Sequence, residues 1–151
     1  RLASAVPAPY SQHILLVHNV CLTQDDIDAA KKVMDNVYWT VCPLSNIFIH
    51  NALPPIPLMR SNGLDIMLGT DSLSSNDDLD MVKEMFCIHQ NFPEVPMSEI
   101  LEWATLNGAR FLKKDDVIGS LEVGKKPGIV RINNIDENGC VTAASSSERI
   151  R

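Results

Sequence analysis

Two polar residues that can carry acid–base chemistry follow short apolar runs of the chain. His18 comes directly after Ile14–Val17, and Asp71 comes shortly after Leu64–Leu68. Runs of this length and composition predict strands buried in a parallel sheet. In parallel α/β folds, ligands and catalytic residues gather at the carboxyl edge of the sheet. An imidazole and a carboxylate at that edge predict general acid–base catalysis or metal coordination.

Both residues also have an ordinary structural interpretation. Asp71 could cap the turn that follows its strand, and His18 could be hydrogen-bonded to backbone. Hydrophobic periodicity alone leaves the functional and the structural interpretation open, so the surrounding sequence has to decide between them.

The segments around these residues predict an α/β fold with crossover helices. Thr23 followed by Asp26 forms a capping box at the start of a helix. A further apolar run, Val37–Cys42, predicts a strand that ends at Pro43. A proline-rich loop with a short helix near residues 56–60 then leads to the third strand. The resulting order, β-α-β-α-β-α-α, is typical of parallel strands joined by helices.

The last two helices follow the third strand. The polar run Ser74–Asp78 supplies capping side chains for the first of them, and the second is predicted to begin near Ser98 and to bury Leu101.

The composition changes near residue 117, where we place a domain boundary. Residues 1–117 form the α/β part, and residues 118–151 form a small β part. Ile129–Ile132 and Val141–Ala144 are predicted strands, because Asn138-Gly139 between them is typical of a hairpin turn.

Composition limits the possible classes of protein. With 151 residues, 45% of them hydrophobic, the chain is long enough for a core and too apolar to be disordered. The net charge of −6 argues against nucleic-acid binding, and no apolar run is long enough to span a membrane. The four cysteines lie far apart and fit no C-x-x-C or zinc-finger spacing, so we expect a reduced, cytoplasmic protein. The chain begins at Arg1 rather than Met, and we expect it to belong to a longer protein.

Four segments in order resemble the C-terminal third of the amidohydrolase superfamily. The resemblance is to its deaminase and chlorohydrolase branch, which includes cytosine, guanine and S-adenosylhomocysteine deaminases. The resemblance implies strands six to eight of a (β/α)₈ TIM barrel with their helices, followed by part of a small β-sandwich. The matching segments are Leu15–Thr23, Cys42–Asn46, Leu68–Ser72, and Ala104–Arg110 with Ile118–Lys125.

This resemblance implies a metal-dependent hydrolase of carbon–nitrogen bonds. The residue matching the family's metal ligand and proton acceptor is Asp71, and the residue that polarises the group under attack is His18. Asn46 and Ser45 match positions that line the substrate pocket. One divalent metal, zinc or iron, would supply a bound hydroxide that adds to a nitrogen heterocycle, and ammonia or chloride would leave.

The family's other metal ligands have no counterpart in the chain. It contains no His-x-His pair, and His13, His50 and His89 match none of the remaining ligand positions. A catalytic zinc takes three protein ligands, so we expect the chain to be inactive without the remainder of the barrel or a second copy. Two alternatives stay open: a non-catalytic binding or scaffold domain, and a hydrolase of cyclic amides.

Overall fold

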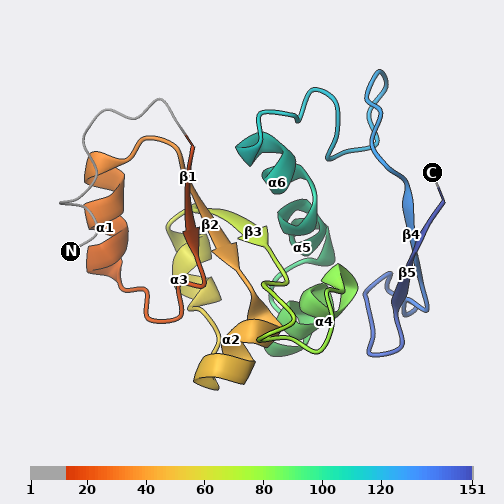
Figure 1. The fold of residues 1–151 in the computed structure, drawn as a ribbon, viewed down its shortest axis with the longest axis horizontal. Helices are drawn as coiled ribbons and strands as arrows, with labels where there is room; N and C mark the ends of the chain where they lie inside the picture. Colours follow the sequence, from red (N-terminus) through yellow and green to blue (C-terminus); the bar gives the residue numbers. More distant parts are fainter. Residues whose placement is uncertain (1–12, 151) are drawn as a thin grey trace.

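The computed structural model describes residues 13–150, and within them three parallel strands form one sheet (Figure 1). These strands are β1 (Ile14–Val17), β2 (Val37–Val41) and β3 (Asp65–Leu68), in the order β1-β2-β3. Trp39 at the centre of β2 lies opposite Leu16 of β1 and Ile66 of β3. The predicted α/β class and all three predicted parallel strands are confirmed.

Helix α1 (Gln24–Val33) connects β1 to β2 and begins where the sequence predicts it. Thr23 and Asp26 form the reciprocal capping box, in which each side chain accepts from the other residue's backbone N–H. Ile27 and Ala30 are buried on the face of α1 that joins the core.

Two helices separate β2 from β3. Helix α3 (Ile56–Ser61) confirms the short helix that the sequence predicts, whereas the sequence does not predict α2 (Pro43–His50). Pro43 ends the strand and also occupies the start of α2, where proline has the required φ and lacks only an N–H that would have no partner inside the helix. This helix turns Ser45 and Asn46 back toward the sheet edge.

The helices after β3 are α4 (Met81–Asn91), α5 (Met97–Ala104) and α6 (Leu106–Phe111). The predicted capping of α4 by Ser74–Asp78 is wrong, because Asp80 is the N-cap and accepts from the backbone N–H of Val82 at 2.8 Å. The helix predicted to begin near Ser98 is α5, and it ends at Ala104 because the backbone of Thr105 leaves the helical region before α6.

The C-terminal part contains an antiparallel pair, β4 (Val130–Asn133) and β5 (Ser146–Arg149). The prediction of a strand at Val141–Ala144 is wrong. That segment belongs to the connection between β4 and β5, and Asn138-Gly139 forms a turn inside this connection. The boundary near residue 117 stays a prediction.

One face of the sheet is buried and part of the other is open. Figure 1 shows the sheet between α1 and the group α4 to α6, with β4 and β5 at the far end. At the β1 edge, Leu15 and Val17 are 37% and 46% exposed.

No helix within residues 13–150 is long and apolar enough to cross a membrane. Buried side chains from the sheet and helices share the core: Ile27, Trp39, Val41, Ile56, Met59, Ile66, Leu68, Met85, Ile88, Ile100 and Trp103.

Candidate active site

His18 and Asp71 lie at the carboxyl edge of the sheet, on either side of β2. Each follows a strand and has a left-handed backbone, with φ of 72° for His18 and 58° for Asp71. Asn19 continues the left-handed turn after His18, with φ of 57°. Such backbone is uncommon outside glycine and concentrates at functional sites. The two turns aim the side chains across the end of β2.

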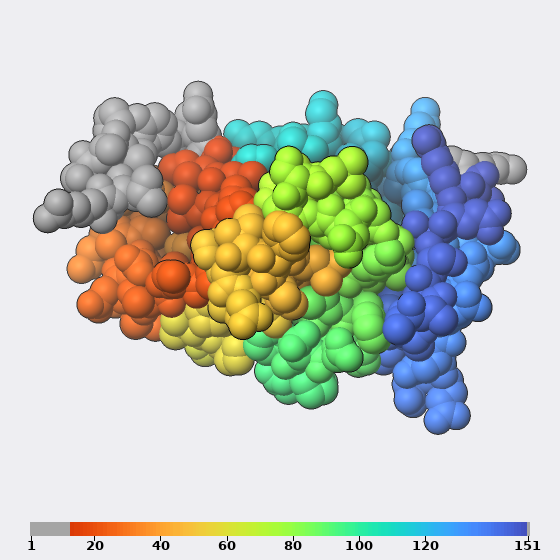
Figure 2. Space-filling view, turned by 60° about the horizontal axis from the view of Figure 1, so that its bottom comes forward, coloured from red at the N-terminus to blue at the C-terminus, as the bar shows by residue number. Residues whose placement is uncertain are grey.

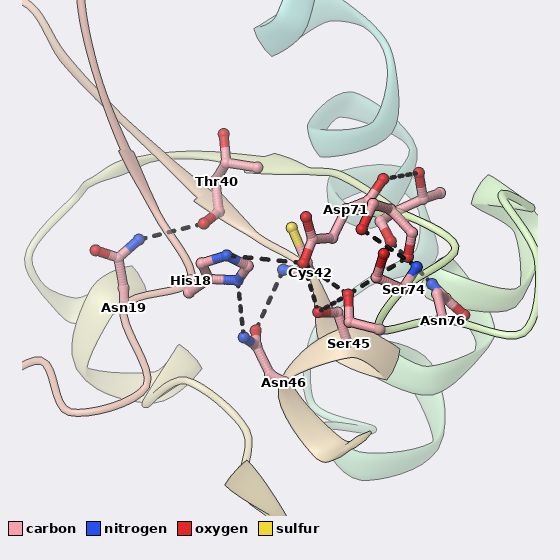
Figure 3. Close-up of polar contacts among 12 residues, drawn as sticks. His18, Asn19, Thr40, Cys42, Ser45, Asn46, Asp71, Ser74 and Asn76 are labelled. Carbon is pink, nitrogen blue, oxygen red and sulfur yellow. Dashed lines mark hydrogen bonds and ion pairs between the residues drawn. The ribbon is translucent and has the colours of Figure 1, made fainter. Parts of the chain in front are cut away.

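The structure brings the two predicted catalytic side chains together (Figure 3). His18 Nε2 lies 3.9 Å from Asp71 Oδ2, and the two side chains remain 37% and 31% exposed. This distance is too long for a hydrogen bond, but an atom placed between them could lie about 3 Å from both groups. Solvent and a small ligand can therefore reach both groups at once.

Two serine hydroxyls hold the carboxylate of Asp71. Ser45 Oγ and Ser75 Oγ each donate a hydrogen bond to Asp71 Oδ2 at 2.8 Å. These bonds hold the pKa of Asp71 below its ordinary value, and the bond from Ser45 is the largest cause. The nearby imidazole of His18 lowers the pKa by a smaller amount. Asp71 is therefore ionised at neutral pH and can accept a proton.

Asn46 contacts His18 from the buried side of the site. Its Nδ2 lies 3.1 Å from His18 Nδ1, and its Oδ1 accepts a hydrogen bond from the backbone N–H of Cys42 at 3.3 Å. Both Ser45 and Asn46 are fully buried in the first turn of α2. The structure shows their contacts to Asp71 and His18, while their predicted contact with substrate stays a prediction.

The site is assembled from three segments that are distant in the sequence. Figure 2 shows the residues of α2 between the end of β1 and the segment after β3. Asn19, whose role the sequence does not predict, holds the segment after β1 against the sheet. Its Nδ2 donates to the carbonyl oxygens of Leu16 and Thr40 at 3.0 and 3.2 Å.

The buried carboxylate of Glu84 joins α4 to α2 and to the segment after β3. The sequence does not predict this role. Glu84 is fully buried and accepts from the backbone N–H of Leu44 at 2.9 Å and from Asn76 Nδ2 at 2.6 Å. Asn76 Nδ2 also donates to the carbonyl oxygen of Thr70 at 2.9 Å. Burial raises the pKa of Glu84 above its ordinary value. The sequence signal for this buried carboxylate is a charged residue, Glu84, among the apolar positions of α4.

The buried thiol near the site is not a nucleophile at neutral pH. Burial raises the pKa of Cys42 to about 12, and the negative charges of Asp71 and Glu84 contribute to the increase. The neutral thiol is unreactive, because the thiolate is the nucleophilic form.

The three other histidines make no hydrogen bond or ion pair to His18 or Asp71 within residues 13–150, although His50 lines the same cavity as His18. His13 packs against Tyr38 and Phe111, and its Nδ1 lies 2.7 Å from the carbonyl oxygen of Phe111. His50 is in the last turn of α2, and His89 is within α4.

The residues that the structure describes do not form a complete metal site. Within residues 13–150, no group of three or more His, Cys, Asp or Glu side chains is arranged to hold a metal ion. Asp71 fits as a single oxygen ligand, because its carboxylate is partly exposed and both serine hydroxyls bond to the same oxygen, Oδ2. A complete site needs ligands beyond these residues.

Comparison with known proteins relates the chain to deaminases. It is 32% identical over 123 residues to the 5-methylthioadenosine/S-adenosylhomocysteine deaminase of Caldanaerobacter subterraneus subsp. tengcongensis. This alignment covers 77% of the chain and 28% of the relative, so the chain spans little more than a quarter of that protein. The 5′-deoxyadenosine deaminase of Methanobrevibacter smithii is 28% identical, over 91% of the chain and 33% of that relative.

Solved structures give the same relationship. The adenosine deaminase of Xanthomonas campestris with bound zinc superposes with a TM-score of 0.67 at 32% identity, over 77% of this chain and 28% of that one. Helicobacter pylori aminofutalosine deaminase in complex with methylthio-coformycin gives a TM-score of 0.66 at 29% identity, over 74% and 28% of the two chains. Residues 4–146 match the amidohydrolase family, and the chain belongs to this family.

Proposed function

We propose that this chain is part of a metal-dependent hydrolase that removes ammonia from a nitrogen heterocycle. The observation that carries the proposal is the approach of His18 Nε2 to Asp71 Oδ2, at 3.9 Å, across the carboxyl edge of the sheet. The side chains are accessible, and buried partners hold them from behind. Family membership supports hydrolysis as the reaction class.

Asp71 and His18 have different roles in the proposed reaction. Asp71, which is ionised at neutral pH as an ordinary aspartate is, accepts the proton of the attacking water. The water oxygen adds to the ring carbon that bears the amino group, and the carbon–nitrogen bond then breaks as ammonia leaves with the transferred proton. His18 lies beside the same point and polarises the ring atom next to the carbon under attack.

We propose one divalent cation as the cofactor, with Asp71 as the ligand that this chain contributes. Zinc is favoured over iron, because the related Xanthomonas campestris deaminase has bound zinc. A divalent cation at this place would acidify the attacking water.

Adenine nucleosides are the substrate class we favour. Relatives at 28% to 32% identity are named for deamination of 5-methylthioadenosine, S-adenosylhomocysteine and 5′-deoxyadenosine. Loss of chloride from a ring and opening of a cyclic amide are the competing reactions of the same site.

We further propose that β1 to β3 are strands six to eight of a (β/α)₈ barrel. The exposed Leu15 and Val17 support this, since they lie on the edge strand where the remaining strands, or a second copy of the chain, would join. Residues 118–151 would then contribute to a small β-sandwich. We place the protein in the cytoplasm, because none of its four cysteines, all within residues 13–150, is in a disulfide.

Release of ammonia tests the proposed reaction. The protein that carries this chain is purified and assayed with adenosine, 5-methylthioadenosine and S-adenosylhomocysteine, and in parallel with a chlorinated triazine and a cyclic amide. We expect ammonia and the corresponding inosine product from at least one nucleoside. Turnover of only the triazine or the cyclic amide would reassign the substrate, and no turnover of any compound would favour a non-catalytic role.

A further inference from the structure

The orientation of the buried Asn46 amide is fixed by a backbone group. The N–H of Cys42 lies 3.3 Å from one amide atom of Asn46, and a backbone N–H can only donate. The atom that faces Cys42 is therefore the oxygen, Oδ1. The other amide atom, Nδ2, consequently faces His18 Nδ1 at 3.1 Å and donates to it.

This contact determines where the neutral imidazole of His18 carries its proton. Nδ2 of Asn46 has only hydrogens to offer, so Nδ1 of His18 must accept with its lone pair. A neutral imidazole protonates one nitrogen and accepts with the other, which leaves the hydrogen on Nε2. Nε2 is the ring nitrogen that faces Asp71 Oδ2, at 3.9 Å.

Within residues 13–150, Asn46 is the group hydrogen-bonded to Nδ1 of His18, while the carboxylate of Asp71 faces Nε2 beyond hydrogen-bond distance and favours the same tautomer. The backbone N–H of His18 donates to the carbonyl oxygen of Thr40 at 2.8 Å, which fixes the residue at the end of β1. Asn46 is fully buried and belongs to the first turn of α2, so its amide keeps one position (Figure 3).

We propose that Asn46 is a positioning residue that holds neutral His18 in the Nε2–H tautomer. The site then offers a hydrogen-bond donor beside the carboxylate of Asp71, and it selects a substrate atom with a lone pair, such as a ring nitrogen next to the carbon under attack. The tautomer rests on contacts within the chain alone, whereas its use in catalysis rests on the proposed function.

Nitrogen NMR of histidine in the protein that carries this chain tests the tautomer. The protein is labelled with ¹⁵N-histidine and measured at a pH where imidazole is neutral, and His18→Gln assigns the signal by its loss. We expect the protonated nitrogen of His18 to be Nε2. A proton on Nδ1 in the unaltered protein would overturn the proposal, and this result needs no variant at position 46 to fold.

Asn46→Asp tests the role of the amide directly. The carboxylate keeps an acceptor for the Cys42 N–H but has no hydrogen for His18 Nδ1, so we expect Nδ1 to carry the ring proton at a pH where the imidazole is neutral. Asn62→Asp is the matched control, because the Asn62 amide pairs with Gln24 away from the site. An unchanged His18 tautomer in folded Asn46→Asp would refute the positioning role.

Kinetics separate this inference from the proposed function. Where the protein deaminates a nucleoside, Asn46→Asp is expected to lower kcat by about a hundredfold with little change in KM, since general acid–base groups contribute about 10²–10⁴-fold. An equal kcat in Asn46→Asp would overturn the catalytic use of the tautomer. Absence of turnover in the unaltered protein would remove the proposed function, and the NMR result would still decide the tautomer.

Discussion

At the scale of single residues, the candidate site depends on polar partners behind the reacting groups. Asp71 is exposed enough to meet a ligand, yet its Oδ2 receives two serine hydroxyls. His18 is likewise open on one side and bonded to Asn46 on the other. These buried partners fix the direction and the charge of the two accessible side chains.

Removing either serine hydroxyl is expected to raise the pKa of Asp71. In Ser45→Ala and Ser75→Ala the ionised carboxylate loses one donor, and Ser45→Ala has the larger effect because that bond is the largest cause of the lowering. Carboxyl ¹³C NMR of aspartate-labelled, metal-free protein measures the shift. Ser61→Ala is the control, since Ser61 Oγ bonds to the carbonyl oxygen of Leu58.

The same substitutions are also expected to change how folding stability depends on acid pH. Asp71 has a lowered pKa in the folded state, so its contribution to folding is present above its ordinary pKa of about 3.9 and is lost as the pH falls through the lowered value. Ser45→Ala is therefore expected to lose less stability on acidification than the unaltered protein. An Asp71 pKa that does not move in either serine variant would contradict this account.

At the scale of elements, Glu84 links α4 to α2 and to the loop after β3. Glu84→Ala leaves the N–H of Leu44 and one of the two N–H groups of the Asn76 amide without their acceptor, at about 1–3 kcal/mol each. We expect urea unfolding to show a loss of at least about 2 kcal/mol.

Glu102→Ala is the matched control for Glu84→Ala. Glu102 pairs with Arg110 at the surface, where such a pair contributes about 0–1 kcal/mol. Equal losses of unfolding free energy in Glu84→Ala and Glu102→Ala would show that the buried carboxylate does not join the elements.

Gly119 marks the place where the C-terminal segment meets α6. Its φ is +91°, and a Cβ there would lie 2.6 Å from Ala109 Cβ. Gly124 has a similar φ of +95° with open space around it. Gly119→Ala is therefore expected to destabilise the protein by about 1–3 kcal/mol more than Gly124→Ala. Thermal or urea unfolding measures the difference, and equal losses would mean that this segment does not pack on α6.

The sequence predicts the elements better than it predicts the contacts between them. Apolar runs identify β1 to β3, and the Thr23–Asp26 capping box identifies the start of α1. The start of α2 at Pro43 could not be predicted, because proline both ends strands and is a favourable first residue of a helix. The roles of Glu84, Asn76 and Ser75 could not be predicted, since their partners are set by tertiary packing rather than by local sequence.

At the scale of the whole molecule, the free edge of β1 determines how the chain behaves alone. A cavity of about 480 Å³ lies along β1 and α1, lined in part by Leu15, Val17 and His18. An open strand edge with apolar side chains favours association. We expect the isolated 151-residue chain to self-associate in light scattering coupled to size exclusion. A monodisperse, folded monomer would contradict the proposal that further strands or a second copy cover β1.

The most direct test of the account is the effect of Asp71→Asn on the protein that carries this chain, measured as ammonia released from the preferred nucleoside together with zinc content. Asp65→Asn is the matched control, because Asp65 is an exposed aspartate at the opposite end of β3. We expect Asp71→Asn to lower turnover by several orders of magnitude and to reduce bound zinc while the fold persists, and Asp65→Asn to change neither. Turnover and zinc content in Asp71→Asn that match those of the unaltered protein would contradict the assignment of Asp71 to the site.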